Sequence, residues 1–106
     1  PLHTNSSIQI RCTKNTTAII SMDSGLHASN ASGTHRAMAN NNGNDYLSYD
    51  IYTNSSFNSA WTANNQVTYI ASNAAPATIN VYGAIPANQN VNDGVYNDVI
   101  TINATF

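Results

Sequence analysis

Residues 96–106 read YNDVITINATF, and they decide the fold that we expect. Apolar and polar residues alternate along this stretch, which is typical of a β-strand with one face in a core. A single long strand at this place in the sequence is predicted to form an exposed sheet edge. The more apolar face of that strand carries Asp98, Ile100, Ile102, Ala104 and Phe106.

Strand patterns cover much of the remaining sequence. The clearest lies at residues 46–53, where both alternating faces carry aromatic side chains, so a central strand is predicted. Residues 8–22 are predicted to form a hairpin, because an alternating run and a polar turn precede Ala18, Ile20 and Met22, which share one face. Shorter strands are predicted at 36–39, 66–71 and 78–85, with Gly83 and Pro86 interrupting the last of them.

The composition indicates one all-β domain spanning residues 1–106. The chain is 42% hydrophobic and only 8% charged, and its polar share consists mainly of 18 Asn, 11 Ser and 11 Thr. These three residue types compete with helical backbone hydrogen bonds and favour turns and strand surfaces. Short strands at this spacing, without a helical segment, predict a sandwich or a barrel.

The charge pattern argues against two classes of function. The formal net charge is -2 and no basic run occurs, whereas a nucleic-acid-binding surface needs clustered Lys and Arg. Attraction to an anionic membrane surface is disfavoured for the same reason. No stretch approaches the roughly 20 apolar residues that cross a bilayer as a helix.

Candidate catalytic and metal-binding residues lack the spacing that their chemistry needs. Ser24, His27 or His35, and Asp23 or Asp45 supply the residue types of a catalytic triad, but no nucleophile-elbow pattern surrounds them. The histidines lack the short paired spacing of a zinc site. We therefore expect polar loops, no enzyme, and no metal or cofactor.

Two further patterns have structural alternatives. Asp93 and Asp98 are one possible carboxylate pair for glycoside hydrolysis, but a turn residue and a strand start explain them better. An aromatic sugar-stacking surface is the second possibility, and packing in the core and sheets explains the same residues equally well. Its members are Tyr46, Tyr52, Trp61 and Tyr69.

Cys12 is the only cysteine of the chain. Small secreted β domains usually carry cysteines in pairs. A single cysteine therefore predicts either a free thiol or a disulfide partner outside these residues.

Several pieces together resemble the spore coat protein U domain family, which includes subunits of archaic chaperone–usher pili. The most specific pieces are Val81-Tyr82-Gly83-Ala84-Ile85-Pro86 and Gly94-Val95-Tyr96-Asn97-Asp98 followed by the alternating strand. Order and spacing also agree for Cys12 with its short turn, 22–25, 36–38, and 47–52 with Trp61 downstream. The resemblance marks Gly83, Pro86, Gly94, Tyr96 and Asp98 as structural motif residues.

The resemblance implies an incomplete immunoglobulin-like β-sandwich that is completed by donor-strand complementation from the next subunit. It implies a structural subunit of an extracellular adhesive pilus that supports attachment and biofilm formation. The implied partners are neighbouring subunits, a periplasmic chaperone and an outer-membrane usher of a Gram-negative bacterium. The alternatives are a tip adhesin domain, which binds a surface or glycan, and a spore-coat structural protein.

The resemblance also assigns provisional roles to residues. The expected wall of the groove that accepts the donor strand is Ile100, Ile102, Ala104 and Phe106. Cys12 is expected to be the second member of the family disulfide. The donor segment, the first strand and the earlier cysteine of a complete subunit are not found in residues 1–106, so the donor role falls on none of them.

Overall fold

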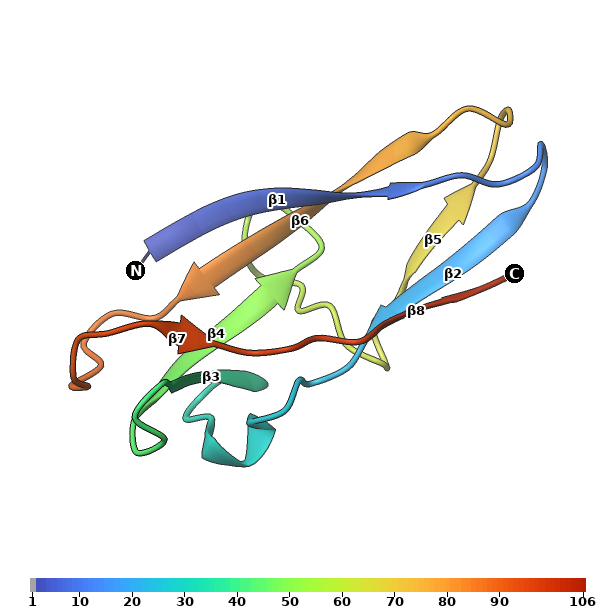
Figure 1. Ribbon diagram of the computed structural model, residues 1–106. Coiled ribbons are helices and arrows are strands. Elements are labelled where there is room, and N and C mark those ends of the chain that lie inside the picture. The colour runs from blue at the N-terminus through green and yellow to red at the C-terminus, as the bar shows by residue number, and fades with distance from the viewer. Residues whose placement is uncertain (1) are drawn as a thin grey trace.

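The computed structural model describes residues 2–106, which form an all-β structure of two antiparallel sheets (Figure 1). The only helix in this range is the short 3-10 helix η1 (Ala28–Asn30). The strands are β1 (Leu2–Ile10), β2 (Thr17–Met22), β3 (Arg36–Asn40), β4 (Tyr46–Tyr52), β5 (Val67–Ile70), β6 (Ala77–Ile85), β7 (Tyr96–Asn97) and β8 (Ile102–Thr105).

The larger sheet has the strand order β1-β6-β4-β3-β7, and the smaller one has the order β5-β2-β8. The strands predicted at 36–39, 46–53, 66–71 and 78–85 are therefore confirmed, with small shifts at their ends. The prediction that residues 46–53 form a central strand is also confirmed, because β4 has two strands on either side. Gly83 does not break its strand, and β6 continues through it to Ile85.

The hairpin predicted at residues 8–22 is wrong. A turn does close there through the Thr16 amide and the Thr13 carbonyl, but β1 pairs with β6 whereas β2 pairs with β5 and β8. The two strands lie in opposite sheets, and Ile8 and Ile10 pack against the cluster that contains Ile20. Burying these apolar faces against each other favours stacking across the core over pairing side by side.

The single long strand predicted at residues 96–106 is also wrong. The chain pairs with β3 through β7, leaves the larger sheet at Asp98, and joins β2 of the smaller sheet through β8. At the crossing, the amide of Asp23 donates to the carbonyl of Thr101 at 3.0 Å, and the amide of Thr101 donates to the carboxylate of Asp23 at 2.9 Å. These bonds satisfy backbone groups where the regular ladders stop.

The apolar core is small for a chain of this size. One cluster contains Ile20, Met22 and Trp61, and a second contains Cys12 with two alanines. The exposed area is 6420 Å², against about 5,700 Å² for a compact protein of this mass. The radius of gyration is 15.3 Å, against roughly 13 Å for a compact domain of this length. The two sheets thus cover each other only in part.

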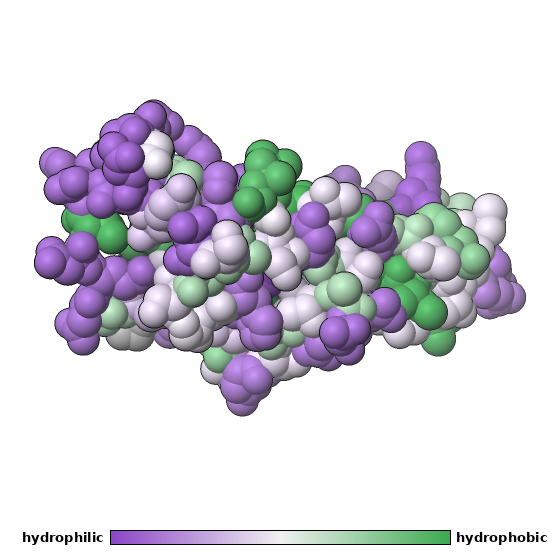
Figure 2. Space-filling view, turned by 90° about the horizontal axis from the view of Figure 1, so that it is seen from below, coloured by the Kyte–Doolittle hydropathy of each residue, from purple (hydrophilic) through white to green (hydrophobic). Residues whose placement is uncertain are grey.

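Hydrophobic side chains accordingly reach the surface in several places. On the face shown in Figure 2, hydrophobic areas alternate with hydrophilic and intermediate ones. The large hydrophobic residues that are exposed are Leu2, Ile19, Leu26, Ile70, Val95, Val99, Ile102 and Phe106.

A buried ion pair links segments that the small core does not join. Arg36 is fully buried and donates from Nη1 to the Asp50 carboxylate at 2.7 Å. The same guanidinium donates to the carbonyl of Asp23 at 2.8 Å and to the carbonyl of Trp61. His35 Nδ1 contacts the other carboxylate oxygen of Asp50 at 2.6 Å. This network joins β3, β4 and the segments after β2 and before β5, which few apolar contacts hold together.

Removal of one partner of this ion pair is predicted to be costly. Arg36→Met leaves the Asp50 carboxylate buried without its main counter-charge, so the free energy of unfolding should fall by about 3–5 kcal/mol. Urea denaturation followed by tryptophan fluorescence measures this loss. The double variant Arg36→Met/Asp50→Leu should recover part of it, because no unpaired charge is then buried. A loss below about 1 kcal/mol in the single variant would show that the network contributes little.

Candidate functional site: an open groove between two strand edges

Two strand edges face each other without a partner in the described residues. β1 is the first strand of its sheet and pairs only with β6, over nine residues from Leu2 to Ile10. β8 is the last strand of the other sheet and pairs only with β2. Figure 1 shows β1 in the upper part of the view and the C-terminal segment passing below it, with β8 beside β2. Each edge leaves backbone donors and acceptors available for a further strand.

An apolar cavity of about 280 Å³ lies between these edges. Ile8 and Ile10 of β1 line one side, and Ile102 and Ala104 of β8 line the other. Ile20 of β2, which is only 1% exposed, contributes to its floor. The groove therefore combines an apolar floor with two unpaired backbone edges.

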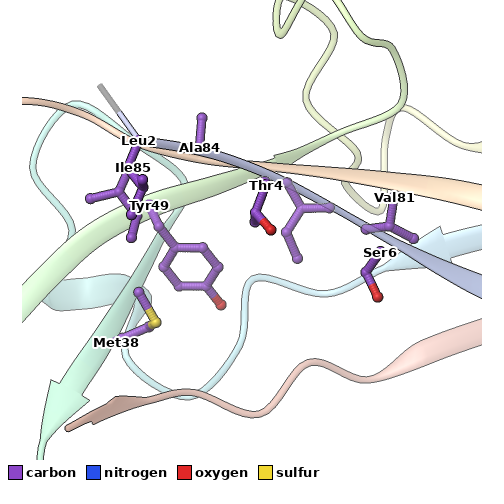
Figure 3. A pocket seen from close by; sticks show the side chains of 10 residues that line it. Leu2, Thr4, Ser6, Met38, Tyr49, Val81, Ala84 and Ile85 are labelled. Atoms are coloured by element: carbon purple, nitrogen blue, oxygen red, sulfur yellow. The ribbon is translucent and has the colours of Figure 1, made fainter.

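A second apolar cavity of about 320 Å³ continues along the inner face of β1. Leu2, Thr4 and Ser6 belong to the same alternating row as Ile8 and Ile10. Figure 3 shows side chains of β1, β3, β4 and β6 around this cavity. Its lining residues are Leu2, Thr4, Ser6, Met38, Tyr49, Ile51, Val81, Gly83, Ala84 and Ile85. The two cavities together form what we call the β1 groove.

Asp98 fixes the segment that crosses between the sheets. Its carboxylate accepts hydrogen bonds from the amide of Leu26 at 2.9 Å and from the hydroxyl of Tyr49 at 2.5 Å. Burial raises the pKa of Tyr49, and the hydrogen bond to Asp98 raises it further. Gly25 lies so close that an added Cβ would meet Asp98 Oδ2 at 2.2 Å. Only a residue without a side chain permits this approach.

Of the four residues expected in the groove wall, two line the groove and two lie elsewhere. Ile102 and Ala104 line the groove, as described above. Ile100 packs against the buried Ile20 cluster instead, because it lies at the crossing between β7 and β8. Phe106 follows β8 and is 72% exposed.

The motif residues surround the same site. Gly83 lines the larger cavity, and Pro86 follows directly after β6. Gly94 has a φ of 139° and lies against Asn40, whose Nδ2 would be 2.9 Å from an added Cβ. Tyr96 pairs with Asn40 in the ladder between β7 and β3. The turn before β7 and the crossing after it are thus fixed by local contacts.

The β1 side of the groove is not predicted from the sequence. The alternating pattern places Ile8 and Ile10 in a hairpin and indicates no role for Leu2, Thr4 or Ser6. The signal was an alternating row that begins at Leu2, but the hydroxyl side chains of Thr4 and Ser6 hide it. Small polar residues are common on strands, so they reveal little about which face is covered.

The candidate catalytic residues do not come together as a triad. The carboxylate that contacts His35 belongs to Asp50, which is not one of the candidate triad residues. The carboxylate of Asp23 accepts hydrogen bonds from the amides of Thr101 and Gly25. In residues 2–106, no three His, Cys, Asp or Glu side chains are grouped as metal ligands would be. No helix in the same range is long and apolar enough to span a membrane.

One of the four residues of the predicted sugar-stacking surface is not at the surface. Trp61 is fully buried, and its indole nitrogen donates to the carbonyl of Ile20 at 3.0 Å. Another aromatic group forms elsewhere, where Phe57 stacks on His3 at 3.9 Å and meets Tyr52 and Tyr82 edge-on. The Phe57 loop therefore covers the outer face of β1, β6 and β4.

Comparison with known proteins gives concordant matches. The sequence model of the Spore Coat Protein U domain matches residues 1–103. Protein U of Myxococcus xanthus is 34% identical over 105 residues, which cover 94% of this chain and 58% of that protein. The chain thus spans little more than half of this relative.

A solved structure also matches this chain. The matching chain belongs to the crystal structure of the CsuC–CsuE chaperone–tip adhesion subunit pre-assembly complex from the archaic chaperone–usher Csu pili of Acinetobacter baumannii. The TM-score is 0.75 with 29% sequence identity, and the match covers 99% of this chain and 35% of the other. This likeness confirms the all-β, pilin-like fold.

The crossing segment makes stability dependent on pH. Hydrogen bonds from the backbone amides of Thr101 and Gly25 lower the pKa of Asp23 below its usual value of 3.8. The unfolded chain then binds more protons than the folded one in acid. The stabilisation is therefore complete above the usual pKa and is lost as the pH falls through the lowered one.

Asp23→Asn should accordingly flatten the fall in unfolding free energy between about pH 5 and pH 2. Urea denaturation at a series of pH values measures the slope. Some slope should remain, because hydrogen bonds from Asn42 and Asn92 also lower the pKa of Asp45. An unchanged slope in the variant would show that Asp23 is not one of the groups responsible.

Proposed function

Because the chain belongs to the Spore Coat Protein U domain family, we propose that it is a structural subunit of an extracellular pilus built by donor-strand exchange. The observation that carries this proposal is the β1 groove, whose smaller apolar cavity lies between two unpaired strand edges. A strand inserted there covers the floor and pairs with β1, with β8 or with both. Subunits that donate and accept in a head-to-tail order then form a fibre that does not close.

Completion of the groove by a strand is energetically favoured over the binding of a small ligand. Exposed backbone edges call for N–H and C=O partners along their length, which an extended peptide supplies at each residue. Alternate side chains of the same peptide enter the apolar cavities beside Ile8 and Thr4. The groove therefore suits a polypeptide strand of a neighbouring subunit.

The open groove also bears on the proteins that would secrete the subunit. A subunit with an open groove needs temporary cover before assembly, because its apolar floor and free edges promote aggregation. The likeness to a chaperone–subunit complex supports a periplasmic chaperone as that cover. Passage through an outer-membrane usher and display on a Gram-negative cell surface follow as parts of the proposal, as does a role in attachment and biofilm formation. No catalytic activity is proposed.

A second candidate is a domain of a tip adhesin, and the likeness to a chain of a complex that contains a tip adhesion subunit favours it. A tip domain should expose apolar residues in the loops at one end. The loops at 23–35 and 86–94 are mostly polar, although Leu26 is 68% exposed. This exposure pattern supports a shaft subunit instead. A spore-coat structural role is the third candidate and rests on the family description.

Cys12 is proposed to form a disulfide with a cysteine outside residues 1–106. The thiol is buried against Ala18 and Ala71, with Ile10 and Tyr69 nearby. The test uses protein from its native source that is unfolded before a thiol-blocking reagent is added. Cys12 should then stay unmodified unless a reductant is added first. Intact-mass measurement with and without the reductant detects the difference. A thiol that reacts in the unfolded, unreduced protein would contradict the disulfide.

The groove itself is tested with a synthetic peptide of alternating apolar residues. Since it binds only the folded protein, the peptide at a hundredfold excess over Kd should add about 2.7 kcal/mol to the unfolding free energy. For a domain of this size the melting temperature should rise by on the order of 10 °C. Ile102→Asp should abolish this rise and fibre formation, because it places an unpaired charge in the groove.

Asn103→Asp is the matched control, since it adds the same charge to the next residue of β8, whose side chain points to the opposite face. It should bind the peptide as the unaltered chain does. No temperature shift at saturating peptide in the unaltered chain would refute the open groove. Normal fibres from Ile102→Asp would refute the placement of β8 in it.

A further inference from the structure

The ladder between β4 and β6 stops before the start of β4. It pairs residues 50–52 of β4 with residues 82–84 of β6. Since the two strands are antiparallel, the same register would bring Pro86 opposite Ser48. Proline has no backbone N–H and cannot donate to a facing strand. The main chain of Ser48 therefore needs hydrogen-bond partners from another part of the structure.

The side chain of Gln89 supplies these partners. Its Oε1 accepts a hydrogen bond from the amide of Ser48 at 2.7 Å, and its Nε2 donates to the carbonyl of Ser48 at 2.9 Å. The same Nε2 donates to the carbonyl of Pro86 at 3.0 Å. A side-chain amide carries the C=O and N–H groups of a peptide bond. Gln89 thus bonds to Ser48 as a residue of a neighbouring strand would.

The contacts fix the orientation of the Gln89 amide. If its oxygen and nitrogen were exchanged, the NH2 group would face the N–H of Ser48 and the oxygen would face two carbonyls. Ser48 is only 5% exposed, so water has little access to its peptide groups. A buried N–H or C=O without a partner is costly. Loss of the Gln89 amide would leave both groups of Ser48 in that condition.

A reversal of the chain after β6 brings Gln89 back toward β4. Asn88 has a φ of 65°, in the left-handed region that Asn adopts more readily than most residues. Residues 86–88 are exposed, whereas Gln89 is half-buried. The turn therefore lies at the surface and directs one polar side chain into the sheet.

Gln89 lies near the start of the crossover from β6 to β7, residues 86–95. β4 and β3 lie between β6 and β7 in the sheet order, so the crossover has to pass both. Figure 1 shows this segment at the left of the view, between the end of β6 and the start of β7. Further contacts join the crossover to the end of β3 and the turn that follows it: Asn92 with Asp45, Asn40 with Asp93, and Asn41 with Val95.

We infer that Gln89 is a positioning residue: its side-chain amide replaces the strand residue that Pro86 cannot provide beside Ser48, and thereby fixes the crossover that leads to β7. Because β7 continues through the crossing segment into β8, this anchor contributes to placing one wall of the β1 groove. The inference goes beyond the proposed function, since it holds whether or not a strand enters the groove.

Hydrogen exchange of single amides, measured by NMR, tests the contact in the unaltered chain and in Gln89→Met. Methionine has a similar length but lacks the donor and acceptor of an amide. Exchange of the Ser48 amide should become faster by about tenfold or more. Exchange of the Asn41 amide, which donates to the carbonyl of Val95 at the far end of the crossover, should also become faster. Gln66→Met is the matched control, because Gln66 is exposed before β5, and it should change neither rate.

Two results of this experiment would overturn the inference. A Ser48 amide that exchanges in the unaltered chain as fast as in an unstructured peptide would show that the contact is absent. This measurement needs no variant, so it decides the question even if Gln89→Met does not fold. A faster rate at Ser48 with an unchanged rate at Asn41 would show that the contact does not fix the crossover.

Gln89→Glu adds a pH profile that a role in packing alone would not produce. At pH 7 the new carboxylate accepts from the amide of Ser48 but has no hydrogen for the carbonyls of Ser48 and Pro86. Its protonated form donates to one of them, so the pKa of this carboxyl in the folded protein should lie above its usual value. The variant should therefore be stabilised in acid and lose this stabilisation as the pH rises through the raised pKa.

The measurement is the melting temperature of Gln89→Glu relative to the unaltered chain. The deficit of the variant should be smaller at about pH 4 than at pH 7. Charged residues on the neighbouring elements are Asp45 before β4, Asp50 on β4, Arg36 on β3 and Asp93 in the crossover. Both proteins contain them, so their titration cancels in the difference. A deficit that is constant or larger in acid would contradict the assigned hydrogen bonds.

Discussion

The facing backbone edges of β1 and β8 are the constraint on which the rest of this structure depends. Each strand pairs on one side only in the described residues. Unpaired peptide groups over an apolar floor are stable in water only where water or another strand bonds to them. The large exposed area and the two apolar cavities accompany this arrangement. In the proposed strand exchange, a strand of a neighbouring subunit would repair this defect.

An open groove requires the remaining structure to hold its shape with a reduced core. Polar interactions supply much of that rigidity. Arg36 and Asp50 lie buried together, and the guanidinium also binds the carbonyls of Asp23 and Trp61. Asp98 and Asp23 then fix the crossing segment between β7 and β8. Since that segment leads directly into the groove wall, the polar network positions Ile102 and Ala104.

The crossing also explains how one segment serves two sheets. β7 pairs with β3 in the larger sheet, and β8 pairs with β2 in the smaller one. The residues between them turn Ile100 into the core, whereas Ile102 and Ala104 face the groove. The same alternating pattern therefore contributes first to the core and then to the lining of the groove.

The sequence by itself determined the all-β class, most strand positions, the central place of β4 and the apolar face that contains Ile102 and Ala104. Alternation carries this information, because it is local. Only the tertiary structure decided that residues 2–10 pair with β6, that residues 96–106 divide between two sheets, and that Gly83 lies beneath a cavity. Backbone hydrogen bonds are the same for every residue type, so they do not specify which distant strand becomes the partner. Burial of whole faces makes that choice, and it depends on residues far apart in the chain.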